Sequence, residues 1–387
     1  MKNNHKPAVV VIGGGVIGAA VTYYLSKAGI PVVLVERDDL ASGTSGACSA
    51  FIWLGTKKPG IHLTLARSSL ELMQDLVNDL DHEIENQLCG EMLLIETEGD
   101  LQFMKDFVAR QRQGGVDIRL LTRSEAKEMQ PALAEERIVG ATYSPLGMLV
   151  NSIEFVLGLI KSAEKMGAEI RLRTKVKNIA TEGGRVRAVR TDRGHIETSC
   201  VVNAAGVDAP EIGAMVGIKI PIIPLRGQIL VTEPAPPLLR VPTIESRYLA
   251  VKRDPELLKK TTRSGVTCGI WQSVRGNIYL GSSKEFVGYN RGITQEAMAT
   301  IAQKTITFYP GLAGLQVIRA YAGLRPYTED GLPILGRVEG VEGFILATGH
   351  GGDGVALSPI TGKLISELIV TGKPSIPIEK LGLSRFG

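Results

Sequence analysis

The chain has 387 residues, of which 44% are apolar and 22% charged. This length exceeds what one compact hydrophobic core accommodates, so we expect at least two domains of ordinary globular composition. The 44 basic and 40 acidic residues leave a net charge of +4 without a dense basic block, which argues against a nucleic-acid-binding protein.

The first predicted elements form one strand–helix–strand unit. Ala8–Ile12 predicts a buried parallel strand, and three consecutive glycines beginning at Gly13 follow it. Val16–Ala28 has the pattern of a helix that Gly29 ends, and Val32–Glu36 predicts a second strand. A βαβ unit of about 30 residues is the smallest dinucleotide-binding module.

The middle of the chain predicts a mixture of amphipathic helices and short strands. Helices are expected over Ile61–Leu80, Asp100–Gln113, Ser124–Met129 and Ser152–Gly167. Strands are expected over Leu93–Glu96, Ile118–Leu121, Ile170–Arg173, Val186–Thr191 and Ile196–Val202.

Residues 220–317 have a different texture, because short strands there alternate with loops rich in proline, arginine and glycine. The predicted strands are Gln228–Thr232, Tyr248–Lys252 and Asn277–Gly281. This pattern favours an antiparallel sheet that faces the substrate. The α/β character returns with a strand at Phe344–Thr348 and a last helix that starts at Ser358-Pro359 and ends at Gly372.

The glycines of the first turn are spaced as Gly13-x-Gly15-x-x-Gly18. In this motif the first glycine permits the tight turn, the second lets the backbone approach a pyrophosphate, and the third lets the helix pack on the strand. Glu36 follows Gly18 by 18 residues, where a carboxylate accepts hydrogen bonds from ribose hydroxyls. The unit predicts dinucleotide binding, although the motif alone does not separate NAD from FAD.

The four cysteines and five histidines are scattered, and no two cysteines have the C-x-x-C spacing. The sequence therefore predicts neither a metal site nor an iron–sulfur site, and its thiols suit a cytoplasmic protein. No apolar stretch reaches 18 residues, so we expect no transmembrane segment.

Six segments that span most of the chain carry a family resemblance: VVVIGGGVIGAAVTYYL, VVLVERDDLASGTSGACSA, VVNAAGVDA, PLRGQI, AGLRPYTEDGLPILG and TGHGGDGVALSPITGKLISELI. Together they resemble the superfamily of FAD-dependent flavoproteins that contains glycine oxidase, sarcosine oxidase and D-amino-acid oxidase. They look most similar to sarcosine oxidase β subunits, dye-linked proline and hydroxyproline dehydrogenases, and the flavin subunits of opine oxidases and hydrogen cyanide synthase. The resemblance does not specify a substrate.

This resemblance implies an α/β fold (α+β overall), with a Rossmann-type FAD-binding domain and an antiparallel-sheet substrate domain that are discontinuous in sequence. We expect the FAD-binding domain to comprise residues 1–88, 142–218 and 318–387. The substrate-binding domain would then comprise residues 89–141 and 219–317. No cysteine or histidine has a position that indicates a covalent flavin link, so we expect non-covalent FAD.

By the same resemblance, FAD is held by the residues Gly13, Gly15, Val16, Ile17, Gly18, Glu36, Arg37, Ser42, Gly43, Thr44, Ser45, Val176, Ala205, Gly206, Arg325, Gly349, Gly351, Gly352, Asp353, Gly354 and Val355. Backbone N–H groups of the loop from Gly349 would face the pyrimidine end of the flavin, where negative charge collects on reduction. Asp353 is an acid in that loop, so we expect its carboxylate to point away from the flavin or to cap the following turn.

Arg325 is the principal candidate for holding the substrate, since the resemblance implies that this arginine binds the substrate carboxylate. A guanidinium matches a carboxylate with two parallel hydrogen bonds and is always charged. The alternative is a structural arginine paired with a nearby acid such as Asp330.

Further candidates are weaker. Tyr248 is expected to place its hydroxyl over the substrate from a strand, or else to be a half-buried sheet tyrosine. For His350 we favour a packing or loop-bonding role over acid–base catalysis. Lys284 could face the flavin as an oxygen-activating cation, but a solvated lysine is the simpler expectation. Lys57 and Lys58 predict surface charge, with a loop near the flavin as the alternative.

These features predict an FAD-dependent dehydrogenase or oxidase of a carboxylate-bearing primary or secondary amine, such as glycine, sarcosine, proline, hydroxyproline or an opine. Hydride transfer from the α-carbon to flavin N5 would leave an imine that hydrolyses. Two alternatives stay open: a 2-hydroxy-acid oxidoreductase on the same fold, and a flavin subunit that is inactive without an electron-accepting partner. We expect a homo- or hetero-oligomer.

Overall fold

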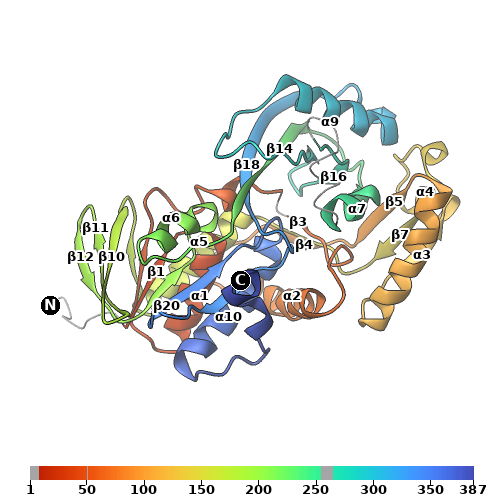
Figure 1. Cartoon of the computed structure of the whole chain (residues 1–387). Coiled ribbons are helices and arrows are strands. Elements are labelled where there is room, and N and C mark those ends of the chain that lie inside the picture. Colours follow the sequence, from red (N-terminus) through yellow and green to blue (C-terminus); the bar gives the residue numbers. More distant parts are fainter. Residues whose placement is uncertain (1–7, 50, 254–264) are drawn as a thin grey trace.

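The computed structural model describes residues 8–49, 51–253 and 265–387, which form a mixed α/β structure. Figure 1 shows two lobes, and a pair of long strands, β14 (Ile223–Pro234) and β18 (Val317–Tyr327), extends between them. A mainly parallel sheet in one lobe and a mainly antiparallel sheet in the other confirm the predicted fold class.

The first lobe is built on a six-stranded sheet with the order β19-β20-β13-β1-β2-β9. Its strands are β1 (Val9–Ile12), β2 (Val32–Val35), β9 (Glu169–Arg171), β13 (Val201–Asn203), β19 (Ile334–Arg337) and β20 (Phe344–Thr348). All run parallel except the edge strand β19, which is antiparallel to β20. The central strands are almost wholly apolar, with Asn203 at the end of β13 and Thr348 at the end of β20 as the exceptions, because both faces of the sheet are covered.

Helices cover one face of this sheet and a smaller sheet covers the other. The helices are α1 (Val16–Lys27), α5 (Ser152–Lys165) and α10 (Gly354–Val370), and α1 packs against the other two. The opposite face carries β10 (Val176–Glu182), β11 (Arg185–Thr191) and β12 (Gly194–Glu197). Successive residues of β1 point to opposite faces, so Val9 joins the helical core and Val10 joins the core beneath the smaller sheet.

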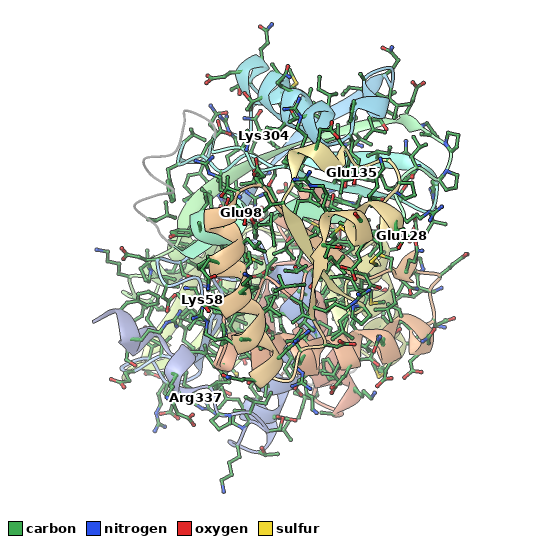
Figure 2. All side chains as sticks on the ribbon, turned by 90° about the vertical axis from the view of Figure 1, so that its right-hand side faces the viewer. Lys58, Glu98, Glu128, Glu135, Lys304 and Arg337 are labelled. Carbon is green, nitrogen blue, oxygen red and sulfur yellow. The ribbon has the colours of Figure 1, made fainter. Side chains whose placement is uncertain are left out.

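The second lobe is built on an eight-stranded sheet with the order β18-β14-β17-β16-β15-β5-β7-β6. Besides the two long strands, it contains β5 (Glu91–Ile95), β6 (Arg119–Thr122), β7 (Gly140–Ser144), β15 (Thr243–Glu245), β16 (Gly269–Gln272) and β17 (Asn277–Gly281). Its helices are α3 (Glu98–Gln113), α4 (Arg123–Met129) and α9 (Gln295–Phe308). Figure 2 faces α3, with Glu98 and Glu128 exposed on this outer side.

Helix α2 (Ile61–Asp79) packs against α10. A small sheet of β3 (Phe51–Ile52), β8 (Met148–Val150) and β4 (Asn86–Leu88) contacts α10 through β3. The division of the chain into domains stays a prediction.

The strand predicted at Tyr248–Lys252 is wrong, because these residues lie in the helix α7 (Arg247–Arg253). Leu249 and Val251 are both buried, so their spacing imitates the alternation of a strand. A short apolar segment does not distinguish the two periodicities, and here the packing of the lobe decided for a helix.

The predicted start of the last helix is also wrong. Helix α10 begins at Gly354, and Pro359 lies inside it. The proline has no N–H for the carbonyl of Val355, and the Ser358 hydroxyl donates a hydrogen bond to that carbonyl at 2.9 Å instead. Strand β10 has no counterpart among the predicted elements.

Close packing of α10 on α1 generates a stability prediction. A Cβ at Gly362 would stand 2.6 Å from the backbone carbonyl of Ala20, so Gly362→Ala should lower the free energy of unfolding by about 1–3 kcal/mol. Gly99→Ala in α3 is the matched control, since the nearest atom, Thr97 Oγ1, would be 3.9 Å away. We expect this control to be neutral or slightly stabilising. Denaturant unfolding measures both, and an unchanged Gly362→Ala protein would contradict the packing argument.

Candidate active site

A cavity lies where the parallel strands end, and it extends to the long strands β14 and β18. Loops that directly follow β1, β2, β13 and β20 contribute to it, which is where open α/β sheets bind their ligands. The predicted cofactor residues that line it are Gly13, Gly15, Val16, Ile17, Glu36, Arg37, Ser42, Gly43, Thr44, Ser45, Val176, Ala205, Gly206, Arg325, Gly349, Gly351, Gly352, Gly354 and Val355. The structure therefore brings together residues from almost the whole length of the chain.

Two predicted cofactor residues, Gly18 and Asp353, do not line this cavity. A Cβ at Gly18 would stand within 2 Å of the Gly13 carbonyl oxygen, so its role is to let α1 approach the turn after β1. Asp353 points its carboxylate at cations from other elements and caps no backbone group of α10 with its side chain. Its predicted alternative as a helix cap is therefore wrong.

The β1 end of the cavity has the geometry of a dinucleotide site. Gly13 has a φ of +114°, and a Cβ there would lie 2.6 Å from the Ala204 carbonyl oxygen. The Glu36 carboxylate accepts hydrogen bonds from the backbone N–H groups of Gly14 at 2.6 Å and Asp38 at 2.8 Å. Since a carboxylate offers about four acceptor positions, two stay available for ribose hydroxyls.

Two helix N-termini open onto the same cavity. Neither α1 nor α10 has a side-chain hydrogen bond from its N-cap residue, and Gly15 and Gly354 at these ends both line the cavity. The first N–H groups of a helix have no partner within the helix and attract negative charge. The pair of helix ends fits a ligand with negative charge near both, such as a pyrophosphate at one and an electron-rich ring at the other.

Arg325 lies in β18, partly buried, where it lines the cavity. Its Nη2 donates to the Ser282 hydroxyl at 2.7 Å and its Nη1 to the Ser283 carbonyl at 3.2 Å. Among the described residues no carboxylate pairs with it, and Asp330 pairs instead with Arg385 at 2.7 Å. The predicted structural pairing with Asp330 is therefore wrong, and the described part of the chain supplies no counter-ion to this cation at the cavity.

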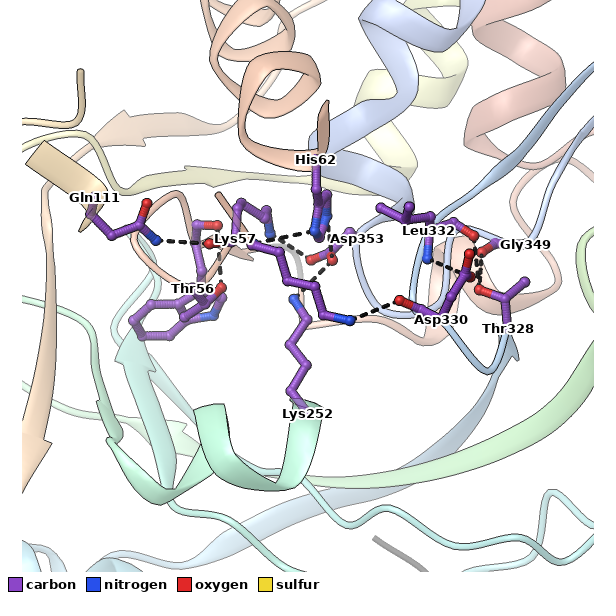
Figure 3. A network of polar contacts seen from close by, with 12 residues as sticks. Thr56, Lys57, His62, Gln111, Lys252, Thr328, Asp330, Leu332, Gly349 and Asp353 are labelled. Carbon is purple, nitrogen blue, oxygen red and sulfur yellow. Dashed lines mark hydrogen bonds and ion pairs between the residues drawn. The ribbon is translucent and has the colours of Figure 1, made fainter. Parts of the chain in front are cut away.

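Figure 3 shows an ionic cluster around Asp353, the residue that directly precedes α10. The Asp353 carboxylate lies 2.5 Å from Lys57 Nζ, 2.9 Å from Lys252 Nζ and 3.2 Å from His62 Nε2. Burial alone would raise the pKa of Asp353, but the two lysines hold this pKa well below its usual range. Lys57 is 1% exposed, so the prediction of surface charge is wrong for it. Lys58 is partly buried and donates to the Asp330 carbonyl at 2.8 Å.

The remaining candidates also have defined places. His350 lines the cavity and its Nε2 lies 3.0 Å from Thr361 Oγ1, and burial lowers its pKa to about 3. Tyr248 is not among the lining residues, and burial raises its pKa. Lys284 is buried and lies 4.3 Å from the centre of the Tyr248 ring, so the prediction of a solvated lysine is wrong.

Sequence reasoning missed several residues near this site. Cys48, Gly227 and Arg291 line the cavity, and Lys252 joins the ionic cluster. The first two lie inside segments that carry the family resemblance, which is a signal that could have found them. No local signal distinguishes Lys252 from a surface lysine.

The comparisons with known proteins agree with this geometry. Residues 8–368 match the model of the DAO family, described as FAD dependent oxidoreductase. The chain belongs to this family. It is therefore an FAD-dependent oxidoreductase, which confirms the cofactor and the superfamily expected from the sequence.

Individual relatives cover nearly the whole chain. Glycine oxidase of Geobacillus kaustophilus is 26% identical over 98% of this chain and 97% of its own. Hydrogen cyanide synthase subunit HcnC of Pseudomonas aeruginosa is 27% identical over 93% and 92%. Among solved structures, L-proline dehydrogenase from P. horikoshii matches with a TM-score of 0.89 and 27% identity, covering 99% of this chain and 98% of that one.

The residues present fit FAD. Ideal Cβ atoms at Gly43, Gly206 and Gly351 would meet no protein atom within 4 Å, so the backbone at these lining positions is open to a ligand. Glu36 suits the adenosine ribose and the start of α1 the pyrophosphate. None of the helices in the described segments is long and apolar enough to span a bilayer.

Gly227 supplies a test of the arginine's position. A Cβ at residue 227 would stand 2.2–2.4 Å from the guanidinium of Arg325, so Gly227→Ala should displace that group. We expect FAD binding to persist and turnover to fall by about 100-fold or more, the usual effect of misplacing a positioning group by 1 Å. Gly311→Ala is the control, because a Cβ there meets no atom within 4 Å. Normal turnover of Gly227→Ala would show that turnover does not depend on the position of the Arg325 guanidinium.

His350 makes stability depend on pH. The unfolded chain takes up a proton on this ring near pH 6.5, whereas in the folded protein burial lowers the pKa to about 3. The free energy of unfolding should therefore fall as pH drops from about 6.5 towards 3, by up to ~1.4 kcal/mol per pH unit from this group. His350→Gln should reduce this slope by up to ~1.4 kcal/mol per pH unit, the contribution of one proton. Denaturant unfolding between pH 4 and 8 measures it, and an unaltered slope would refute the assignment.

Proposed function

We propose that this FAD-dependent oxidoreductase oxidises a small amine that carries a carboxylate, of the glycine, sarcosine, proline, hydroxyproline or opine type. The observation that carries the proposal is Arg325, a cation that lines the FAD cavity and has no carboxylate partner among the described residues. A charged group taken out of water without a counter-ion is costly, so its natural complement is an anionic ligand.

The surroundings of Arg325 support this role. Its two nitrogens bind Ser282 and Ser283, which hold the guanidinium in one orientation. The side chain passes within 3.5 Å of a Cβ built on Gly352, in the loop that leads to α10. A carboxylate bound there would hold the substrate's α-carbon next to the ring that this loop contacts.

The proposed reaction requires few protein groups besides Arg325. Bound FAD supplies the acceptor for the hydride from the α-carbon. Arg325 would bind and orient the substrate. His350 is neutral near pH 7 because burial keeps its pKa at about 3, which supports a structural role at Thr361 instead of proton transfer.

The names of two similar proteins support an amine as the substrate. Glycine oxidase and L-proline dehydrogenase are both named for amino acids. A relative named as a subunit, HcnC, supports an electron-accepting partner as a second proposal. The four cysteines, all within the described residues, form no disulfide, which supports a reducing compartment such as the cytoplasm.

The proposal is tested by the reductive half-reaction, which needs no electron acceptor and therefore no partner subunit. The holoenzyme is mixed anaerobically with glycine, sarcosine, proline, hydroxyproline, an opine and matching 2-hydroxy acids, while the long-wavelength flavin absorbance is followed. We expect bleaching by at least one amine. Bleaching by hydroxy acids alone would overturn the amine assignment.

Arg325→Met should retain FAD and weaken the apparent affinity for the reacting amine by at least tenfold, about 1.5 kcal/mol for a lost charge-assisted hydrogen bond. Arg325→Lys should recover only part of this, because an ammonium lacks the planar fork. Arg319→Met is the matched control, since Arg319 is exposed on the same strand. An unchanged affinity in Arg325→Met would refute the carboxylate role.

A further inference from the structure

Lys284 occupies a position that the proposed reaction does not explain. It directly follows Ser282 and Ser283, the two residues that hold the Arg325 guanidinium. It is 9% exposed, although lysine is among the residues least often buried. Burying an ammonium costs free energy unless a partner group stabilises it.

The described contacts of Lys284 are neutral. Its Nζ donates to the Thr267 hydroxyl at 2.9 Å and lies 4.3 Å from the centre of the Tyr248 ring. Among the described residues no carboxylate is within ion-pair distance. Burial and then the positive charge of Arg325 hold the pKa of Lys284 well below its usual value, so the two cations influence one another.

The nearby acids are already engaged. The Glu245 carboxylate contacts Lys304 Nζ at 2.8 and 3.2 Å and accepts the backbone N–H of Cys268 at 2.9 Å. Asp353 contacts both Lys57 and Lys252, which Figure 3 shows converging on its carboxylate. One carboxylate thus faces two lysines before Arg325 and Lys284 are counted.

Tyr248 connects these groups. The charges of Asp353, Lys57 and Arg325 all act on the pKa of its hydroxyl, and its ring lies below the Lys284 ammonium. Two described carboxylates, Asp353 and Glu91, act on Lys57 and Lys252, so Arg325 and Lys284 add positive charge for which the described residues supply no adjacent carboxylate. One substrate carboxylate on Arg325 offsets only part of it.

We propose that Lys284 forms a second anion subsite beside Arg325, and that the substrate is an amine with two carboxylates, such as an acidic amino acid or an N-carboxyalkyl amino acid. This inference rests on the proposed function, because it takes the first carboxylate to lie on Arg325. The Tyr248 ring supports the ammonium from one side, and the long flexible lysine stem reaches a distal group that a short amino acid lacks.

The test uses unreactive ligands on the holoenzyme, so that binding is measured without turnover. Succinate and glutarate are titrated against butyrate and acetate by calorimetry and by the perturbation of the flavin spectrum. The wild type should bind the dicarboxylates at least tenfold more tightly than butyrate, the effect of one added charge-assisted contact. Equal affinities would overturn the second subsite without any variant.

Substitutions then locate the effect. Lys284→Met should lose the preference for dicarboxylates while its affinity for acetate stays within about twofold, and Lys284→Arg should restore part of the preference. Lys105→Met, which removes an exposed lysine on α3, is the control. A preference that persists in Lys284→Met would overturn the assignment.

The same titrations separate this inference from the proposed function. Arg325→Met should weaken the binding of monocarboxylates and dicarboxylates alike. If no carboxylate binds the wild type, or Arg325→Met binds acetate normally, the proposed function fails. If monocarboxylates bind through Arg325 and the second carboxylate adds nothing, only the subsite at Lys284 fails.

Discussion

One buried carboxylate, Asp353, links three parts of the molecule that are far apart in sequence. It stands at the start of α10, and Lys57 from the segment before α2 and Lys252 from α7 both contact it. Removing the Asp353 carboxylate would leave two lysines in this largely buried site without their shared counter-ion, which is more costly than the pairing is favourable. The loop that lines the FAD cavity is thereby anchored to the lobe that carries the proposed substrate groups.

The groups proposed for the cofactor and those proposed for the substrate differ in kind. The part of the cavity that we propose for FAD is lined by the glycines after β1 and β20 and by the N-termini of α1 and α10, so backbone groups would make many of the contacts. Partial charges of this kind suit a cofactor that stays bound while its electron count changes. The groups proposed for the substrate, Arg325 and Lys284, are basic side chains, which suit recognition of small anions that enter and leave.

This division explains what family membership settles. Backbone geometry is retained across a fold family because many side chains are compatible with it, so the match over residues 8–368 reports the cofactor. In our proposal substrate choice depends on side chains of the larger sheet, and functional side chains vary among enzymes of one fold. At 26–27% identity the relatives named here support an amino-acid substrate class and leave its members to experiment.

The amino-acid sequence by itself determined the βαβ unit, Glu36, the FAD cavity residues and Arg325, because each depends on local spacing or on a segment shared across the family. It did not determine α7, since a short apolar segment has no decisive period, nor the burial of Lys57 and Lys284. Those lysines are buried because distant elements enclose them, and Lys57 is paired there with Asp353. Contacts between residues so far apart in the sequence form only in the folded chain, so no local sequence pattern predicts them.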